Sequence, residues 1–182
     1  KINFFFFSIA LEKRIETLHI TRTMQTRAEE LSAEINEVNQ RIDALSKLSN
    51  LAMLLYSWFI KNGHARNESD EEKVKEYLNA HLPDNAYLQT GFYEKLYLYQ
   101  SLCWYAFIRQ DFLMYFRYSK KWVDLFKNEP MMITVETGHY IKGLHNLLTA
   151  NFDLRNFKQF DKYLARFERF TFSKPANQHD NF

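Results

Sequence analysis

Two stretches of this chain follow one pattern: DFLMYFRYSKKWVDL at residues 111–125 and NFKQFDKYLARFERF at residues 156–170. Aromatic residues occupy the second, fifth, eighth and twelfth positions of both stretches, and the two copies are offset by 45 residues. Steps of three and four residues bring side chains onto one face of an α-helix. Helix pairs that repeat every 40–47 residues or so are typical of an α-solenoid, in which each pair covers the next. We therefore expect a stack of helix pairs.

The rest of the chain also favours an all-α fold. Its 182 residues include only four Gly and three Pro, too few turn-forming residues for a sandwich or barrel of short strands. From Ser8 to Lys61 it contains neither, and its apolar residues keep helical spacing. We predict a right-handed α-α superhelix of antiparallel helix pairs with a long N-terminal helix. The helix content should exceed about 60%, against about a third for globular proteins in general.

Turn and capping residues give the expected limits of the helices. Asn62-Gly63 ends the long N-terminal segment, and Ser69 is expected to cap the next helix, with Glu72 completing a capping box. That helix should run to about His81, before the turn at Pro83-Asp84-Asn85. Four further helices are predicted, at about residues 87–108, 112–128, 132–150 and 154–171. Six large rings of the two copies should be buried between stacked helices: Tyr115, Tyr118, Trp122, Phe160, Tyr163 and Phe167.

The N-terminal part of the chain carries a helical seam that needs a partner. Apolar residues from Ala28 to Leu45 follow an a/d pattern. A second seam, from Leu11 to Leu18, has another register, so the shift near Arg22–Met24 marks either a stutter in one helix or a break between two. We expect the segment Leu51–Ile60, apolar nearly all round, to be buried on several sides and to cover the seam. A second copy of the chain is the alternative cover. Because we prefer cover from the chain itself, we favour a monomer over a homodimer.

The expected organisation is one continuous domain of three parts. Residues 1–50 form an amphipathic helical segment, residues 51–172 form the repeats, and residues 173–182 form a frayed polar tail. The net charge is close to neutral at +2, so no field of the whole protein attracts nucleic acid. Residues 87–182 nevertheless contain thirteen basic and nine acidic side chains, which makes this part the basic one.

A motif in residues 99–112 links the chain to a known repeat family. Tyr99-x-x-Leu102-Cys103 is followed by the turn Arg109-Gln110-Asp111 and by Phe112, and Leu144, Leu147 and Phe157 keep the same spacing in the next copy. This order resembles the first helix and turn of a tetratricopeptide repeat, with an aromatic residue at the family's Trp position. The period of 45 residues departs from the family's 34, and Tyr115 and Phe160 stand where the family has Ala. The resemblance spans about residues 50–172 and implies a scaffold that binds proteins.

The N-terminal run and the single cysteine bear on the compartment. The apolar run from Ile2 ends at about Leu11 and meets charged residues with no small-residue cleavage site, so it does not fit a secretory signal. It is also shorter than the roughly 18 apolar residues that span a bilayer. We interpret it as the apolar end of a helix in a piece of a longer chain. Cys103 excludes an intramolecular disulfide and fits a reducing compartment, so we expect a cytoplasmic protein.

Sequence motifs for catalysis are weak. Two Glu-x-x-His pairs, Glu16–His19 and Glu136–His139, have the spacing used in di-iron helical bundles, but no further inward Glu accompanies them. There is no Gly-x-Ser-x-Gly and no Gly-rich phosphate loop, and Cys103 lies in an apolar helix where a thiol behaves as a small hydrophobe. We therefore expect a protein that is not an enzyme and has no cofactor. A metal-dependent helical-bundle enzyme is the distant alternative.

The helix expected at 87–108 gives the first candidate binding surface. Phe92 and Tyr99 lie on one side of this helix, and Tyr93, Tyr97 and Trp104 lie on the other. Both sets can be core in a stack, but Tyr and Trp on an exposed inner face would suit a peptide groove. We predict that a protein or peptide partner, and not a membrane, binds on the concave face made by the first helix of each pair. Four residues are the candidates for this groove: Tyr93, Tyr97, Trp104 and His139.

The second candidate surface is a basic ridge. Steps of 3-4-4-3 place five cations of the last expected helix on one face: Arg155, Lys158, Lys162, Arg166 and Arg169. Arg117 and Lys121 precede Lys162 and Arg166 by 45 residues, so neighbouring repeats would continue the ridge. A solvated outer face is the simpler interpretation. The alternative function is binding of nucleic acid or of an acidic partner through this ridge.

Overall fold

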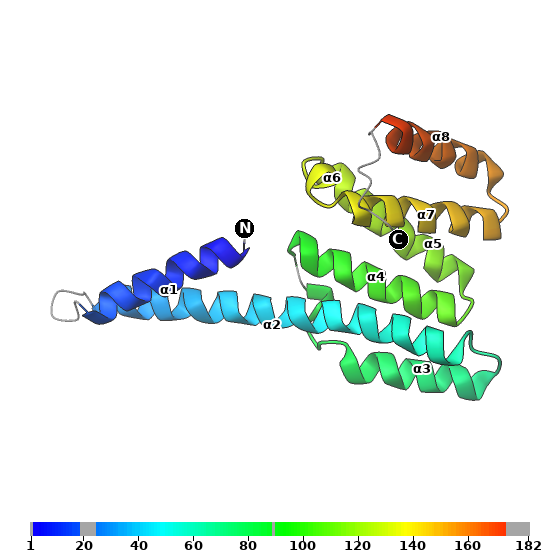
Figure 1. Ribbon diagram of the computed structural model, residues 1–182. Coiled ribbons are helices and arrows are strands. Elements are labelled where there is room, and N and C mark those ends of the chain that lie inside the picture. The colour runs from blue at the N-terminus through cyan, green and yellow to red at the C-terminus, as the bar shows by residue number, and fades with distance from the viewer. Residues whose placement is uncertain (1, 19–24, 89, 174–182) are drawn as a thin grey trace. The chain divides into compact units, whose positions relative to one another are not determined.

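The computed structural model describes residues 2–18, 25–88 and 90–173, and the side chains of residues 7–15, 17, 27–88 and 90–168. Helices make up 86% of the described residues and no strand occurs among them, so the predicted all-α fold and helix content are confirmed. The elements, shown in Figure 1, are α1 (Ile2–Leu18), α2 (Gln25–Asn62), α3 (Glu68–His81), η1 (Ala86–Leu88), α4 (Phe92–Ile108), α5 (Phe112–Asn128), α6 (Met132–Val135), α7 (Thr137–Asp153) and α8 (Phe157–Ser173). The chain forms two compact units, Lys1–Lys47 and Leu48–Phe182.

In the first unit, α1 packs on the N-terminal part of α2. Among the described side chains, its buried core contains Ile9, Leu31 and Val38, and Ile35 and Ile42 pack against them. On the flank, Nε of Arg27 donates to Glu12 of α1 at 3.0 Å. The shift predicted near Arg22–Met24 falls outside the described residues, and the helices on either side end at Leu18 and begin at Gln25.

The prediction of which segment covers the seam is wrong. Residues of α1 cover it, and Leu51–Ile60 does not, because that segment is the continuation of α2 itself. The second seam also differs from the prediction, since Leu11 and Ile15 of α1 are exposed. Among the described side chains of α1, Ile9 supplies the buried contact.

In the second unit, each long helix packs on the next. Residues 48–62 of α2 share a core with α3 and α4, and α4 packs on α5, α5 on α7 and α7 on α8 (Figure 1). The core between α4, α5 and α7 contains large, fully buried side chains: Trp122, Phe126, Leu144 and Leu147. The core between α2, α3 and α4 is built in the same way from Leu51, Leu55, Val74 and Leu102. Burial of apolar surface on this scale is the main stabilising term of such a fold.

The 45-residue offset of the sequence is also an offset of the backbone. Before α5, Gln110 has φ 56°, and before α8, Arg155 has φ 55°. Around Gln110, the amide of Asp111 donates to the carbonyl of Ala106 at 2.9 Å, and around Arg155 the amide of Asn156 donates to Asn151 at 2.8 Å. These bonds close a Schellman motif, so the same helix end and the same turn occur twice.

The start of α3 corrects the predicted cap. The helix begins at Glu68, and the cap is Asn67, whose side-chain oxygen accepts from the amide of Asp70 at 2.9 Å. Ser69, the expected cap, lies inside the first turn. The first turn contains Glu68, Asp70 and Glu71, whose negative charges suit the positive end of the helix dipole. The predicted end at His81 is confirmed.

Three other predicted limits also need correction. The helix expected from residue 87 begins at Phe92, after the short η1. The helix expected at 132–150 is divided into α6 and α7 at Glu136, which has φ −119° and ψ 48°. The last helix begins at Phe157 rather than at residue 154, because the Schellman turn at Arg155 separates it from α7. Ser173, the first residue of the predicted tail at 173–182, is the last residue of α8, and residues 174–182 lie outside the described residues.

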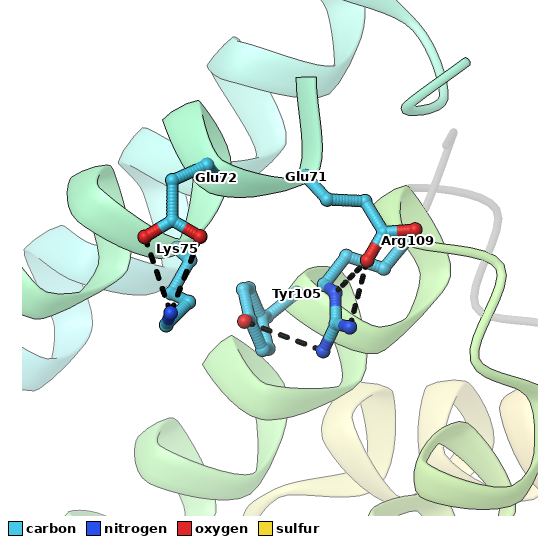
Figure 2. A network of polar contacts seen from close by, with 5 residues as sticks. All are labelled: Glu71, Glu72, Lys75, Tyr105 and Arg109. Atoms are coloured by element: carbon cyan, nitrogen blue, oxygen red, sulfur yellow. Dashed lines mark hydrogen bonds and ion pairs between the residues drawn. The ribbon is translucent and has the colours of Figure 1, made fainter. Parts of the chain in front are cut away.

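A polar network ties α3 to the end of α4 (Figure 2). The guanidinium of Arg109 donates to Oε2 of Glu71 from Nη2 at 2.8 Å and from Nε at 3.2 Å. It also lies over the ring of Tyr105, 5.2 Å from the ring centroid. A charged fork with two bonds and a ring contact is stronger than a simple surface ion pair. Arg109 therefore holds the C-terminal end of α4 against α3.

Candidate binding groove

One face of α2 in the second unit is exposed although it is apolar. Met53, Tyr56 and Ile60 are 61%, 48% and 65% exposed, and their spacing places them on the same side of the helix. The prediction that Leu51–Ile60 is buried on several sides is therefore wrong. The reason is that α3 and α4 cover the opposite side, where Leu51 and Leu55 are fully buried.

A cavity of about 190 Å³ opens beside this exposed face. Three helices line it: Ser49, Ala52, Met53 and Tyr56 come from α2, Tyr97, Gln100 and Trp104 from α4, and His139 and Lys142 from α7. Each of these helices therefore contributes one wall.

A second cavity of about 220 Å³ adjoins the first and shares three lining residues with it: Gln100, Trp104 and Lys142. Its other walls are residues of α4, α5 and α7: Cys103, Phe107, Tyr115, Trp122, His145, Asn146 and Thr149. It thus lies between α4 and α7, with α5 as its floor. We refer to the two cavities together as the aromatic groove.

The rings of the groove contact one another in a continuous series. Tyr56 lies 5.0 Å from Trp104 between ring centroids, Trp104 lies 5.9 Å from Phe107, and Phe107 lies 5.7 Å from Tyr115. Phe59 joins the series at 5.7 Å from Trp104. Tilted and edge-on pairs at these distances are favourable arrangements, and they hold the walls in place.

Polar contacts organise the other end of the groove, where α4 meets the start of α7. The hydroxyl of Tyr93 donates to Oε1 of Glu136 at 2.9 Å, and Nδ1 of His139 lies 3.0 Å from Oε2 of the same carboxylate. The ring of His139 in turn packs edge-on against Tyr97, with 5.9 Å between centroids. Burial and the bond to Glu136 together raise the pKa of Tyr93 to about 12, so its hydroxyl stays protonated at neutral pH.

The predicted groove residues lie near one another in the structure. Tyr97, Trp104 and His139 line the first cavity, and Tyr93 bonds to Glu136, the carboxylate that His139 also contacts. All four are half-buried, so they are neither pure core nor freely solvated. Sequence reasoning missed Met53, Tyr56, Gln100 and Lys142. The spacing of Met53, Tyr56 and Ile60 was a usable signal for an apolar face, but it did not show that this face lacks a covering helix.

The basic ridge is less continuous than predicted. Arg155 lies in the turn before α8 and does not share the face of that helix. Lys158 and Lys162 are exposed on α8, and Arg117 is exposed on α5. The side chain of Arg169 lies outside the described residues. The ridge therefore contains fewer aligned cations than its sequence spacing indicates.

Two cations of the ridge lie over tyrosine rings. The ammonium of Lys121 lies 5.0 Å from the ring centroid of Tyr118, and the guanidinium of Arg166 lies 5.4 Å from that of Tyr140. Lys127, Lys162, Tyr163 and Arg166 nevertheless surround a cavity of about 330 Å³ between α5 and α8. Asp124 offsets part of this charge, because it pairs with Lys120 at 2.6 Å and with Lys127 at 2.5 Å.

The remaining reactive groups have structural surroundings. Cys103 is 2% exposed, and burial raises the pKa of its thiol to about 12, although the Oγ of Ser119 at 3.6 Å opposes the shift. Glu136 and His139 bond to each other, and Glu16 and His19 lie outside the residues whose side chains are described. Among the described residues, no group of three or more His, Cys, Asp or Glu could hold a metal ion. No helix in the described part of the chain is long and apolar enough to cross a membrane.

Comparison of the chain with protein-family models, with curated proteins and with solved structures found no match. The resemblance to tetratricopeptide repeats therefore rests on the motif around Tyr99–Phe112.

Proposed function

We propose that this chain is a non-enzymatic helical-repeat scaffold that binds an extended segment of a partner protein in the aromatic groove. In this proposal the second unit is a divergent, tetratricopeptide-like right-handed superhelix. Its first helices are α2, α4 and α7, and its second helices are α3, α5 and α8. The groove then lies on the concave face, where such arrays bind their partners.

The observation that carries the proposal is the pair of adjoining cavities across α2, α4 and α7. An exposed apolar stripe beside a ring-lined cleft with a polar rim is typical of an interaction site. Tyr and Trp are the residues that most often dominate binding energy at such sites. Here Tyr56, Tyr97 and Trp104 supply these rings from two helices, next to the exposed Met53 and Ile60.

The charges of the groove indicate the chemistry of the partner. Lys142 lines both cavities, and among the described residues no Asp or Glu lines either of them. Glu136, which lies beside His139, already accepts a bond from Tyr93 and lies 3.0 Å from Nδ1 of His139. A segment with apolar or aromatic anchors and an acidic neighbour would complement this surface.

Peptide display on the full chain tests the proposal. A random peptide library would be selected on the protein, and the affinity of the selected peptides measured by isothermal titration calorimetry. Tyr56→Ala and Trp104→Ala should each weaken binding about thirtyfold or more, since truncation of a central ring costs about 2 kcal/mol or more. Lys142→Glu should weaken peptides that carry an acidic residue and spare those without one.

A matched control is available on the same unit. Tyr87 is 61% exposed and lies in η1, outside both cavities, so Tyr87→Ala should leave the affinities unchanged. Selected peptides that bind equally to the parent and to both groove variants would show that the groove is not the binding site.

The basic cavity supports a second candidate function, the binding of an acidic partner or nucleic acid. Three cations and a tyrosine line it, and Lys162 is exposed. Phosphate contacts release counterions, so affinity for a single-stranded oligonucleotide should fall steeply with salt. Lys162→Gln should reduce that slope by about one charge. An affinity for oligonucleotides that does not change with salt would remove this candidate.

A further inference from the structure

The cavity between α5 and α8 gathers positive charge at one place. Its lining contains three cations from two helices and one ring: Lys127 of α5, and Lys162, Tyr163 and Arg166 of α8. Among the described residues, no Asp or Glu lines this cavity of about 330 Å³. Like charges around one space repel each other, and together they attract a negatively charged ligand.

The carboxylates nearby neutralise only part of this charge. Asp124 pairs with both Lys120 and Lys127, so one negative charge faces two positive charges on α5. On α8, neither cation of the cavity pairs with a carboxylate of the described residues. Asp161 and Glu168 are exposed on that helix, where solvent and salt screen their charges. A surplus of about three positive charges therefore remains around the cavity.

The cations of α8 also have donors available for an anion. Lys162 is exposed, and neither Lys162 nor Arg166 donates a hydrogen bond to a described residue. The guanidinium of Arg166 lies over the ring of Tyr140, 5.4 Å from its centroid. Such a ring contact involves the charge of the guanidinium and does not use its N–H fork, which suits the oxygens of a phosphate.

The arrangement of the cations favours a compact ligand over an extended strand. A nucleic-acid backbone requires cations at intervals along a surface, but Arg155 lies off the face of α8 and Lys121 lies over the ring of Tyr118. The other cations converge on one cavity, whose volume lies at the lower end of the usual range for small ligands, about 300–1,000 Å³. A phosphate monoester carries about 1.5–2 negative charges at neutral pH, so two phosphate groups match the positive surplus better than one.

We propose that this cavity binds a small polyphosphate, a ligand with two or more linked phosphate groups, and that the ligand joins α8 to α5. The inference rests on the second candidate function only in using the same cavity, and it does not depend on the aromatic groove. Helix α8 packs on α7, and none of its described side chains is fully buried. A polyanion between Lys127 and Lys162 replaces repulsion across the cavity by attraction to both helices, so it should stabilise the attachment of α8.

Titration of the full chain with inorganic pyrophosphate, in the absence of divalent cations, tests the proposal. Isothermal titration calorimetry measures the affinity, and thermal unfolding measures the stabilisation that follows from binding to the folded state. Pyrophosphate should bind about tenfold or more tightly than orthophosphate, because the second phosphate adds charge-assisted hydrogen bonds. Hydrogen exchange of the α8 amides should slow when pyrophosphate binds.

Substitutions of single lysines locate the site. Lys162→Gln should weaken the binding of pyrophosphate about tenfold, since it removes one charge-assisted hydrogen bond, and Lys127→Gln should do the same from α5. Lys158→Gln is the matched control, because Lys158 is exposed one turn earlier on α8 and does not line the cavity, so the affinity should stay unchanged. Without ligand, Lys162→Gln should not lower the Tm, because it relieves repulsion instead of removing a bond.

The outcomes separate this inference from both proposed functions. If pyrophosphate does not bind, if orthophosphate binds equally well, or if Lys158→Gln weakens binding as much as Lys162→Gln, the polyphosphate site does not exist. Oligonucleotide binding that depends on Lys162 and is not displaced by pyrophosphate would support the second candidate function and contradict this inference. A failure to select groove-dependent peptides would contradict the scaffold alone, since the cavity shares no lining residue with the groove.

Discussion

Helices α5 and α8 are two copies of one sequence pattern, yet their burial differs. Both begin one residue after the same Schellman turn, and both are 17 residues long. In α5, Tyr115 and Trp122 are 6% and 1% exposed, whereas their counterparts in α8, Phe160 and Phe167, are half-buried. The reason is that α5 packs between α4 and α7, and α8 packs on α7. The pattern determines which element forms, and the neighbours determine how much that element stabilises the fold.

The largest expected effect tests this contrast directly. Trp122→Ala should lower the free energy of unfolding by about 3–5 kcal/mol, because it removes a large ring from a closed core. Phe167→Ala should lower it by roughly 1–2 kcal/mol, because a half-buried ring buries less apolar area. Urea denaturation of both variants measures the difference. Equal losses would show that α8 is as well covered in solution as α5.

The two copies also differ at Cys103, a titratable residue of the first copy that has an apolar counterpart in the second. In the first copy, the thiol of Cys103 contacts Ser119, and the residues 45 positions later are Leu148 and Leu164. Burial raises the pKa of Cys103 from 9.0 to about 12, so the folded state keeps a proton that the unfolded state loses. Below about pH 9 the thiol is protonated in both states and does not change the free energy of unfolding. As the pH rises from 9 towards 12, the unfolded state ionises first and the free energy of unfolding falls. The slope is up to about 1.4 kcal/mol per pH unit.

Cys103→Ala should therefore flatten the fall in stability above about pH 9, and urea midpoints at several pH values measure it. Lysines and tyrosines also titrate in this range, so the difference between variant and parent carries the result. Leu148→Ala in the second copy is the matched control, since it removes a buried side chain without a titrating group. Parallel pH profiles for Cys103→Ala and the parent would show that the thiol opens to solvent before it ionises.

A smaller effect concerns a feature that the copies share. Lys121 and Arg166 are 45 residues apart, and each places its cation over a tyrosine ring, Tyr118 and Tyr140 respectively. Lys121→Gln and Arg166→Gln should each lower the free energy of unfolding by about 0.5–1 kcal/mol, the usual value of such contacts at partly exposed sites. Tyr140→Leu should remove most of the effect of Arg166→Gln in a double-mutant cycle. Additive losses would mean that the ring contact contributes nothing.

The limits of some helices could be predicted and others could not, for physical reasons. The start of α5 was predicted correctly because Asp111 is a strong cap directly before the first ring, and its side chain accepts from the amide of Met114. At α3, Asn67-x-x-Asp70 and Ser69-x-x-Glu72 both fit a capping pattern, and local sequence does not decide between them. The break at Glu136 carries no Pro and no Gly of its own, so nothing in the periodicity indicated it.

The groove shows the same division between local and non-local information. The rings of α4 could be predicted as a possible binding face because their spacing is local. The walls from α2 and α7 depend on which faces the packing leaves uncovered. A segment that is apolar nearly all round, such as Leu51–Ile60, does not indicate how many neighbours it has. For this reason Met53 and Tyr56 were expected in the core and instead line the groove.

The smallest expected effect tests how far the two turns are equivalent. Gln110 and Arg155 have φ 56° and 55°, in the left-handed region where a side chain is strained by roughly 1–2 kcal/mol. Glycine removes this strain, but it also loses roughly 0.5–1 kcal/mol through the greater freedom of the unfolded chain. Gln110→Gly and Arg155→Gly should therefore each raise the free energy of unfolding by only a few tenths of a kcal/mol. Because this balance depends on backbone geometry and not on burial, the two gains should agree even though the helices that follow differ in cover. Chemical denaturation of both variants, with Gly63 left unchanged as the existing positive-φ glycine, measures the gains. A clear gain at one turn and a loss at the other would show that the repeat extends to the sequence pattern but not to the energetics of its turns.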